Sequence, residues 1–198
     1  MAGMDEGVDT DKRELRARIR KDRLALDPLG RQAAGAALAM QLSELVSRLG
    51  ASRVSCFLPT RTEPDTRSFL TLAATAGIEV LLPSSREDGL LDWIRPSGEG
   101  TAPGAFGIDE PLGERLGPGS LAQVDLMLVP AAAVDLEGHR LGWGRGYFDR
   151  ALAALDSVPP VYAVVYDHEV LERVPVEGHD VPVDGAVTPA RAIDFGAR

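Results

Sequence analysis

The chain has 198 residues, a length that suits one domain and that can bury a sizeable core without covalent cross-links. Its formal net charge of −9 argues against general nucleic-acid binding, which requires a basic surface. No apolar stretch approaches the ~20 residues that span a bilayer and no N-terminal segment resembles a signal peptide, so we expect a cytoplasmic protein without a membrane partner.

A leader and a basic helix are predicted at the N-terminal end. Residues 1–9 are small and acidic and show no periodicity, so we expect a disordered leader ahead of a single domain over residues 10–198. A helix is predicted over residues 10–26. Between Lys12 and Arg23, seven basic residues stand against two acidic ones. This local excess is expected to attract an anionic ligand to the helix.

The rest of the chain alternates between apolar strands and helices. Helices are expected at 31–49, 65–76 and 147–155, and strands at 53–58, 78–82, 90–95, 124–129, 161–166 and 186–188. Residues 96–119 are rich in Gly and Pro and are predicted to be mostly loop. The single cysteine, Cys56, lies in the first strand and is expected to be buried and unreactive. This alternation predicts one three-layer α/β domain with a mostly parallel central sheet and helices on both faces.

The segment from Arg140 to Asp149 is the most informative part of the chain. It contains three alternate glycines, which leave backbone amides unshielded and lead into a helix: Gly142, Gly144 and Gly146. Unpaired amides at a helix N-terminus favour a bound anion. Arg140 and Arg145 bracket the loop and can fork onto phosphate oxygens. A tight surface turn without a ligand is the plain alternative, which the flanking arginines disfavour.

The role of Asp149 and the kind of nucleotide motif are left open by the residues alone. Asp149 would repel a phosphate unless a divalent cation such as Mg²⁺ lay between them. Alternatively, its carboxylate merely complements the helix dipole. The standard nucleotide motifs do not apply, because no Gly-Lys-Ser/Thr follows the glycines and Tyr147 stands at the third glycine of a dinucleotide loop.

The run Arg140-Leu141-Gly-x-Gly-x-Gly-Tyr147-Phe148-Asp149-Arg150, preceded by Pro130 and Asp135, closely resembles the 5-formyltetrahydrofolate cyclo-ligases, also called 5,10-methenyltetrahydrofolate synthetases. The resemblance extends from Lys12 to about Thr188. It implies that the chain, expected to be a monomer, converts 5-formyltetrahydrofolate to 5,10-methenyltetrahydrofolate while Mg²⁺-bound ATP is cleaved to ADP and phosphate. The formyl oxygen would be phosphorylated to an iminium phosphate, which N10 then attacks.

The resemblance also assigns residues to each ligand. The positions implied for ATP are Lys12, Arg16, Arg140, Leu141, Gly142, Trp143, Gly144, Arg145, Gly146, Tyr147 and Phe148. Those implied for the folate are Leu58, which follows Phe57, together with Glu63, Trp143, Gly144, Arg145, Gly146 and Tyr147. Arg145 and Tyr147 are the expected catalytic residues. The expected metal ligands are Asp149 and Asp180, with Asp184 as a substitute. Phe148 stands where the family commonly has Tyr, so a ring remains without its hydroxyl.

Two other functions stay open at this point. A sugar-phosphate isomerase or a coenzyme A transferase on a similar sheet would need an acidic base or nucleophile near the loop, and Asp135 or Glu137 could serve. A non-enzymatic regulator could bind folate or a nucleotide in the same pocket without turnover.

Overall fold

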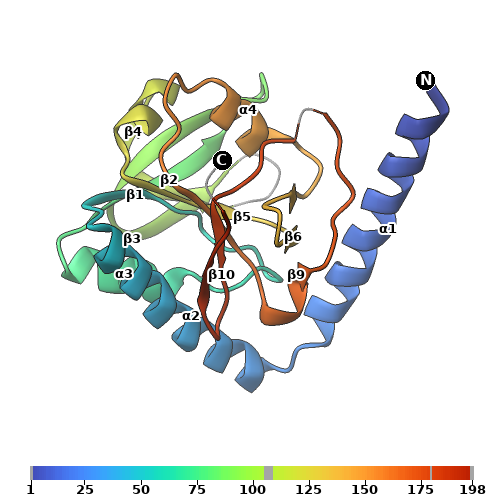
Figure 1. Ribbon diagram of the computed structural model, residues 1–198. Helices are drawn as coiled ribbons and strands as arrows, with labels where there is room; N and C mark the ends of the chain where they lie inside the picture. The colour runs from blue at the N-terminus through green and yellow to red at the C-terminus, as the bar shows by residue number, and fades with distance from the viewer. Residues whose placement is uncertain (1, 105–108, 179, 197–198) are drawn as a thin grey trace.

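A mixed sheet in the order β11-β10-β8-β5-β1-β2-β3-β4 forms the centre of the molecule. The computed structural model describes residues 2–104, 109–178 and 180–196 (Figure 1). The central strands of the sheet are parallel to one another, whereas β11, β3 and β4 run antiparallel to their neighbours. The strands are β1 (Arg53–Ser55), β2 (Glu79–Ser85), β3 (Leu91–Pro103), β4 (Asp109–Leu116), β5 (Leu126–Pro130), β8 (Val161–Val164), β10 (Gly185–Val187) and β11 (Ala192–Asp194).

Helices cover both faces of this sheet, which confirms the three-layer α/β prediction. The alternation of side chains along β5 sends Leu126 and Leu128 to one face and Met127 and Val129 to the other. The first pair belongs to the core beneath α2 (Pro28–Leu49) and α3 (Arg67–Thr75). The second pair belongs to the core beneath α4 (Tyr147–Ala153) and the 3-10 helix η2 (Pro118–Gln123).

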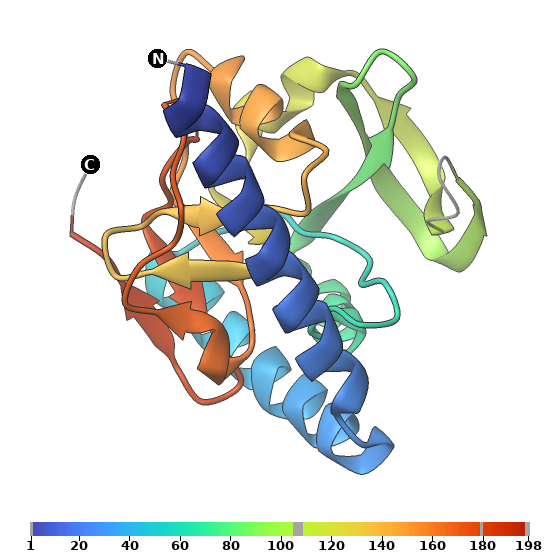
Figure 2. The ribbon, with the colours of Figure 1, turned by 90° about the vertical axis from the view of Figure 1, so that its right-hand side faces the viewer.

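A second, smaller sheet supports the N-terminal helix. It contains β6 (Ala133–Asp135), β7 (Arg140–Leu141) and β9 (Val170–Leu171), in the order β7-β6-β9. The helix α1 (Ala2–Ala25) crosses the β6–β7 hairpin (Figure 2). Ile19 of α1 packs there against Ala133 and Leu141. The sequence did not predict this sheet, because strands of two or three residues are too short to show alternation.

The helix α1 begins at Ala2, whereas the sequence placed its start near residue 10 and left residues 1–9 as a disordered leader. From Gly7 to Asp11 this part of the helix buries no side chain. Without a packed face it shows no apolar periodicity, which explains why the sequence gave no signal. An ion pair between Asp9 and Arg13, one turn apart, is compatible with the helix there.

The prediction of a loop over residues 96–119 is wrong for most of that segment. The strand β3 continues to Pro103 and pairs with β4 as an antiparallel ribbon whose register shifts between Pro96 and Thr101. Glycine serves close packing there, since a Cβ atom on Gly113 would lie 2.0 Å from the carbonyl oxygen of Arg95. Residues 105–108, which belong to the same predicted loop, lie outside the described residues.

Candidate functional site

The three glycines of the loop join β7 to α4, and we call residues 142–146 the glycine loop. Gly144 has φ +89° and Gly146 has φ +66°, a region of backbone conformation that L side chains rarely adopt. Gly146 is the N-cap residue of α4, and its carbonyl accepts the amide of Arg150 at 3.1 Å. The loop therefore enters the helix directly, as the glycine spacing predicted.

A pocket of about 150 Å³ lies between the glycine loop, the loop after β1 and the strands β2 to β4. Of the predicted site residues, those that line it are Leu58, Glu63, Arg140, Gly142, Trp143, Arg145, Gly146, Tyr147, Phe148 and Asp149. The predicted residues that do not line it are Lys12, Arg16, Leu141, Gly144 and Asp180. Pro83, Ser85, Leu91 and Glu110 line the pocket but were not predicted.

Glu63 stands on the side of the pocket formed by the loop after β1. It is buried, and its Oε2 accepts the amide of Thr60 at 2.8 Å. The hydroxyl of Thr66, just before α3, donates to the carbonyl of Phe57 at 2.7 Å and ties the two ends of this loop together. Phe57 belongs to the core under α2, so the carboxylate is carried on a loop anchored to the sheet.

Arg140 and Asp149, which also line the pocket, form an ion pair. The side chain of Arg140 is only 2% exposed. Its Nε atom and the Nε1 atom of Trp143 are buried and have no hydrogen-bond partner among the described residues. A buried donor without an acceptor is costly and calls for an explanation. Both residues line the pocket, but these two nitrogen atoms are themselves inaccessible, so a ligand would reach them only after a side-chain shift.

The helix α1 reaches the glycine loop and the C-terminal loop through two cations. Arg16 Nε donates to the carbonyl of Gly142 at 2.8 Å. Lys12 is buried, and its Nζ contacts Glu177 Oε2 and Asp180 Oδ2, each at 2.6 Å. The structure thus joins the lysine predicted for ATP to an acid predicted for the metal.

The two predicted metal ligands are each paired with a cation, and among the described residues no group of three or more His, Cys, Asp or Glu side chains is arranged to hold a metal ion. A carboxylate together with substrate phosphates is a usual way to hold Mg²⁺, and of these two acids Asp149 lines the pocket whereas Asp180 does not. The substitute, Asp184, instead accepts the amide of Val161 at 2.7 Å beside the sheet.

The acids of the rival enzyme classes do not lie in the pocket. Asp135 is buried and accepts the amides of Glu137, His139 and Val174 at 2.9–3.1 Å, so its carboxylate organises a turn. The side chain of Glu137 is 72% exposed. Neither group lines the pocket beside the glycine loop.

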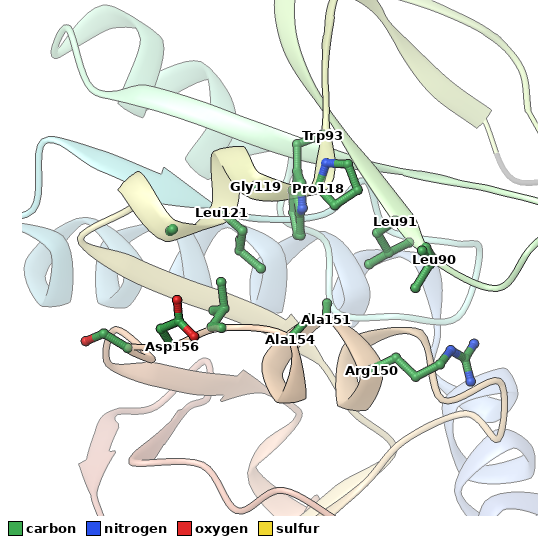
Figure 3. Close-up of a pocket in the computed structure, with 13 residues that line it drawn as sticks. Leu90, Leu91, Trp93, Pro118, Gly119, Leu121, Arg150, Ala151, Ala154 and Asp156 are labelled. Carbon is green, nitrogen blue, oxygen red and sulfur yellow. The ribbon is translucent and has the colours of Figure 1, made fainter.

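A second cavity, of about 390 Å³, lies between α4, β3 and η2 (Figure 3). Its walls are mainly carbon, from residues such as Leu90, Trp93 and Leu121, with Arg150 and Asp156 as charged members. It is larger than the pocket at the glycine loop but contains none of the predicted site residues. Phosphate recognition requires donors, so we place the candidate site at the smaller pocket.

Two arginines of α1 that sequence reasoning missed also approach the loop. The guanidinium carbons of Arg20 and Arg23 lie 5.6 and 5.0 Å from the ring centroid of Trp143. Together with Lys12 and Arg16 they recur at helical spacing. The family resemblance identified Lys12 and Arg16, and the same helical spacing continues to Arg20 and Arg23.

The single thiol of the chain is buried, as predicted. Cys56 is buried in the core, and burial raises the pKa of its thiol to about 12. No described helix is both long enough and apolar enough to cross a bilayer.

The mostly parallel sheet, the glycine loop and the arginine-lined pocket beside it define an α/β enzyme with a site suited to an anionic small molecule. Residues 8–189 match the model of the 5-formyltetrahydrofolate cyclo-ligase family. The chain belongs to this family and is a ligase.

Individual relatives agree along nearly the whole chain. The 5-formyltetrahydrofolate cyclo-ligase of Mycolicibacterium smegmatis is 35% identical over 190 residues, which cover 92% of this chain and 95% of that protein. The 5-formyltetrahydrofolate cyclo-ligase of Escherichia coli K12 is 31% identical over 184 residues, which cover 89% of this chain and 100% of that protein. The NMR structure of 5,10-methenyltetrahydrofolate synthetase from Aquifex aeolicus has a TM-score of 0.79 and 32% identity, covering 94% of both chains.

Proposed function

We propose that the chain catalyses the ATP-dependent cyclisation of 5-formyltetrahydrofolate to 5,10-methenyltetrahydrofolate, with release of ADP and phosphate. The names of its relatives supply the folate substrate and product. The observation that carries the proposal to this chain is the pocket beside the glycine loop, where Arg140 and Arg145 lie together with the buried carboxylate of Glu63. Phosphate oxygens of a bound substrate would accept from the guanidinium groups.

The reaction needs activation of an amide oxygen, which is a poor leaving group. In the proposed first step the formyl oxygen takes the γ-phosphoryl group of ATP, which gives an iminium phosphate and ADP. N10 of the same folate then attacks the formyl carbon. The carbon–oxygen bond breaks, phosphate leaves with its electron pair, and N10 loses its proton. No covalent enzyme intermediate is required, so the protein mainly positions groups and offsets charge.

In this proposal the amides of the glycine loop bind the phosphates together with Arg140 and Arg145. Leu141 belongs to the ATP site, which Lys12 and Arg16 approach from α1. Arg145 offsets the charge that develops on the transferred group. Mg²⁺, when bound, would supply charge neutralisation of the phosphates, and Asp149 and Asp180 are the carboxylates that would hold it. Their present partners, Arg140 and Lys12, are cations that a phosphate can recruit.

The folate would occupy the side of the pocket with Leu58 and Glu63, where a buried carboxylate can accept N–H groups of the pterin. Trp143 and Tyr147 supply the facing rings. The hydroxyl of Tyr147 donates to the carbonyl of Arg86 at 3.4 Å, and the guanidinium carbon of Arg150 lies 5.3 Å from its ring centroid. These contacts position the ring at the start of α4.

We propose a monomer in the cytoplasm as the working unit, and the lone buried thiol is compatible with that compartment.

The test is an assay of the purified chain with Mg-ATP and 5-formyltetrahydrofolate, in which the absorbance of the methenyl product and the release of ADP are followed together. The proposal expects one ADP for each methenyl group formed, and no ADP when the folate is omitted. Absence of folate-dependent ADP would remove the ligase reaction. Binding of both ligands without turnover would instead indicate the regulator.

A further inference from the structure

Arg23 and Glu169 form an ion pair that is wholly enclosed behind the glycine loop. Both side chains are 0% exposed. Arg23 Nε and Nη2 donate to the two oxygens of Glu169 at 2.6 and 2.7 Å, and Nη2 also donates to the carbonyl of Ala131 at 2.8 Å. Arg23 belongs to α1 and Glu169 to the turn after β8. The pair therefore links two segments that are 146 residues apart in sequence.

The guanidinium of this pair lies close to two aromatic rings. Its carbon is 5.0 Å from the ring centroid of Trp143 and 5.5 Å from that of Tyr166. Tyr166 is buried, and its backbone amide donates to Glu169 Oε2 at 2.7 Å, so the same carboxylate holds the backbone that carries this ring. Trp143, in contrast, belongs to the glycine loop and lines the candidate pocket. The arrangement connects the buried charge to the pocket through one side chain.

A buried ion pair is weak ground for stability, because the desolvation of two charges offsets much of their attraction. Here one guanidinium nitrogen, Nη1, also lacks a hydrogen-bond partner among the described residues. A core that served packing alone would be at least as stable with apolar residues at both positions. What apolar residues would not supply is a desolvated cation over the face of the Trp143 ring, which restricts where the ring can lie.

We propose that the Arg23–Glu169 pair is a positioning element for the ligase reaction: it holds the Trp143 ring, and with it the glycine loop, in the orientation that the substrates require. This inference rests on the proposed function of the pocket. Neither residue lines the pocket, so both act through Trp143. Arg20 contributes less, because it is exposed and lies farther from the ring, at 5.6 Å.

The decisive variant replaces both charges at once, as Arg23→Met with Glu169→Gln. The glutamine oxygen can still accept the amide of Tyr166, so no unpaired buried charge remains. We expect this double variant to unfold at nearly the same temperature as the parent chain. Its kcat/KM for 5-formyltetrahydrofolate should nevertheless fall about tenfold, the scale of one desolvated cation–π contact.

A second readout does not depend on catalysis. The chain has two tryptophans, so a Trp93→Phe background leaves Trp143 as the one fluorophore of its kind. In that background and without ligands, the double variant should show a red-shifted emission maximum and about twofold stronger quenching by acrylamide, since a ring released from its cation becomes more accessible. Arg20→Met is the matched control on the same helix and should change both readouts much less.

The outcomes separate this inference from the proposed function. If the parent chain has no ligase activity, the proposed function fails, while the fluorescence still reports whether the pair holds the ring. A folded double variant with unchanged Trp143 emission, quenching and kcat/KM would overturn the inference, as would an equal effect of Arg20→Met. Should the double variant not fold, Arg23→Lys keeps the charge but not the two-pronged contact. An unchanged quenching in that variant counts against the inference, and an intermediate increase supports it.

Discussion

Arg140 and Asp149 are paired with each other at the pocket, although one is suited to phosphate and the other to a metal ion. Lys12 and Asp180 repeat this arrangement where α1 meets the C-terminal loop. Arg140 and Asp149 neutralise one another, whereas Lys12 is shared between Asp180 and Glu177. When Mg²⁺ and a phosphate bind, each cation would pair with the phosphate and each carboxylate with the metal ion. Ligand binding would then replace one set of ion pairs by another and leave no buried charge without a partner.

Replacement of Asp149 tests this exchange. Asp149→Asn keeps the size of the side chain but removes the negative charge, so the phosphates lose the carboxylate that would hold their metal. We expect kcat to fall about 100-fold or more, the scale of a preorganised charge in a reaction centre. Because the buried Arg140 loses its charged partner, thermal stability should fall as well, so circular dichroism has to show a folded variant at the assay temperature.

Glu137→Gln is the matched control, since its carboxylate is exposed and lies outside the pocket. This variant should retain full ligase activity. Near-normal turnover by Asp149→Asn would refute the metal role of Asp149. A loss of activity in Glu137→Gln would support a role for Glu137 as an acidic base or nucleophile.

The contact between Arg16 and the glycine loop gives a second prediction. Arg16→Ala removes the donor to the carbonyl of Gly142, and with it a charge beside the phosphate site. Because a hydrogen bond from a charged group is stronger than a neutral one, we expect kcat/KM for ATP to fall about tenfold or more. Arg18→Ala, an exposed arginine on the same helix, is the comparison. Equal losses in the two variants would indicate a general effect of charge, which added salt would reproduce in the parent chain.

Gly144 tests the need for backbone freedom in the loop. A Cβ atom there would meet Arg16 at an ordinary 3.6 Å, so the penalty of Gly144→Ala comes from the φ of +89°. We expect a loss of about 1–2 kcal/mol in the free energy of unfolding, or a shift of the loop that lowers kcat/KM for ATP. Gly119→Ala has open space and should be neutral. Unchanged stability and activity in Gly144→Ala would show that the loop tolerates another backbone conformation.

The sequence predicted those features whose signals are local. The apolar stripe that ends at Gly50 defined α2, and Gly50 does adopt the left-handed C-cap conformation. The spacing of the three glycines likewise predicted a loop before α4, and Gly146 does adopt a left-handed conformation as its N-cap residue. The ribbon of β3 and β4 was missed, because its glycines and prolines read as a loop when the pairing partner is unknown.

Contacts between distant segments could not be predicted in this way. The pairing of Lys12 with Asp180 joins residues 168 positions apart, and no local pattern identifies either as the partner of the other. Glu63 was assigned through a family resemblance, because an isolated glutamate in a loop carries no signal of its own. The structure explains its burial by the loop that Thr66 closes.

The pH dependence of stability gives the last prediction. Asp125 accepts the amides of Arg53 and Ser52 at 2.9 and 2.8 Å and the hydroxyl of Ser52 at 3.0 Å. These hydrogen bonds, the one from the Arg53 amide first, lower the pKa of Asp125 in the folded chain below its ordinary value of 3.8. A lowered folded pKa means that the stabilisation is present above pH 3.8 and is lost as the pH falls through the folded value.

Asp125→Asn should therefore lower the melting temperature at pH 7 by only about 1–2 °C, because the side chain is exposed and solvent screening keeps the loss below about 1 kcal/mol. The difference from the parent chain should shrink as the pH falls below about 4, where the parent carboxylate begins to be protonated in the unfolded state. Melting curves of the two proteins at pH 7 and at successively lower pH measure this. The exposed Asp156→Asn serves as the reference for a general charge effect. A difference that stays constant with pH would mean that Asp125 acts through shape rather than through its charge.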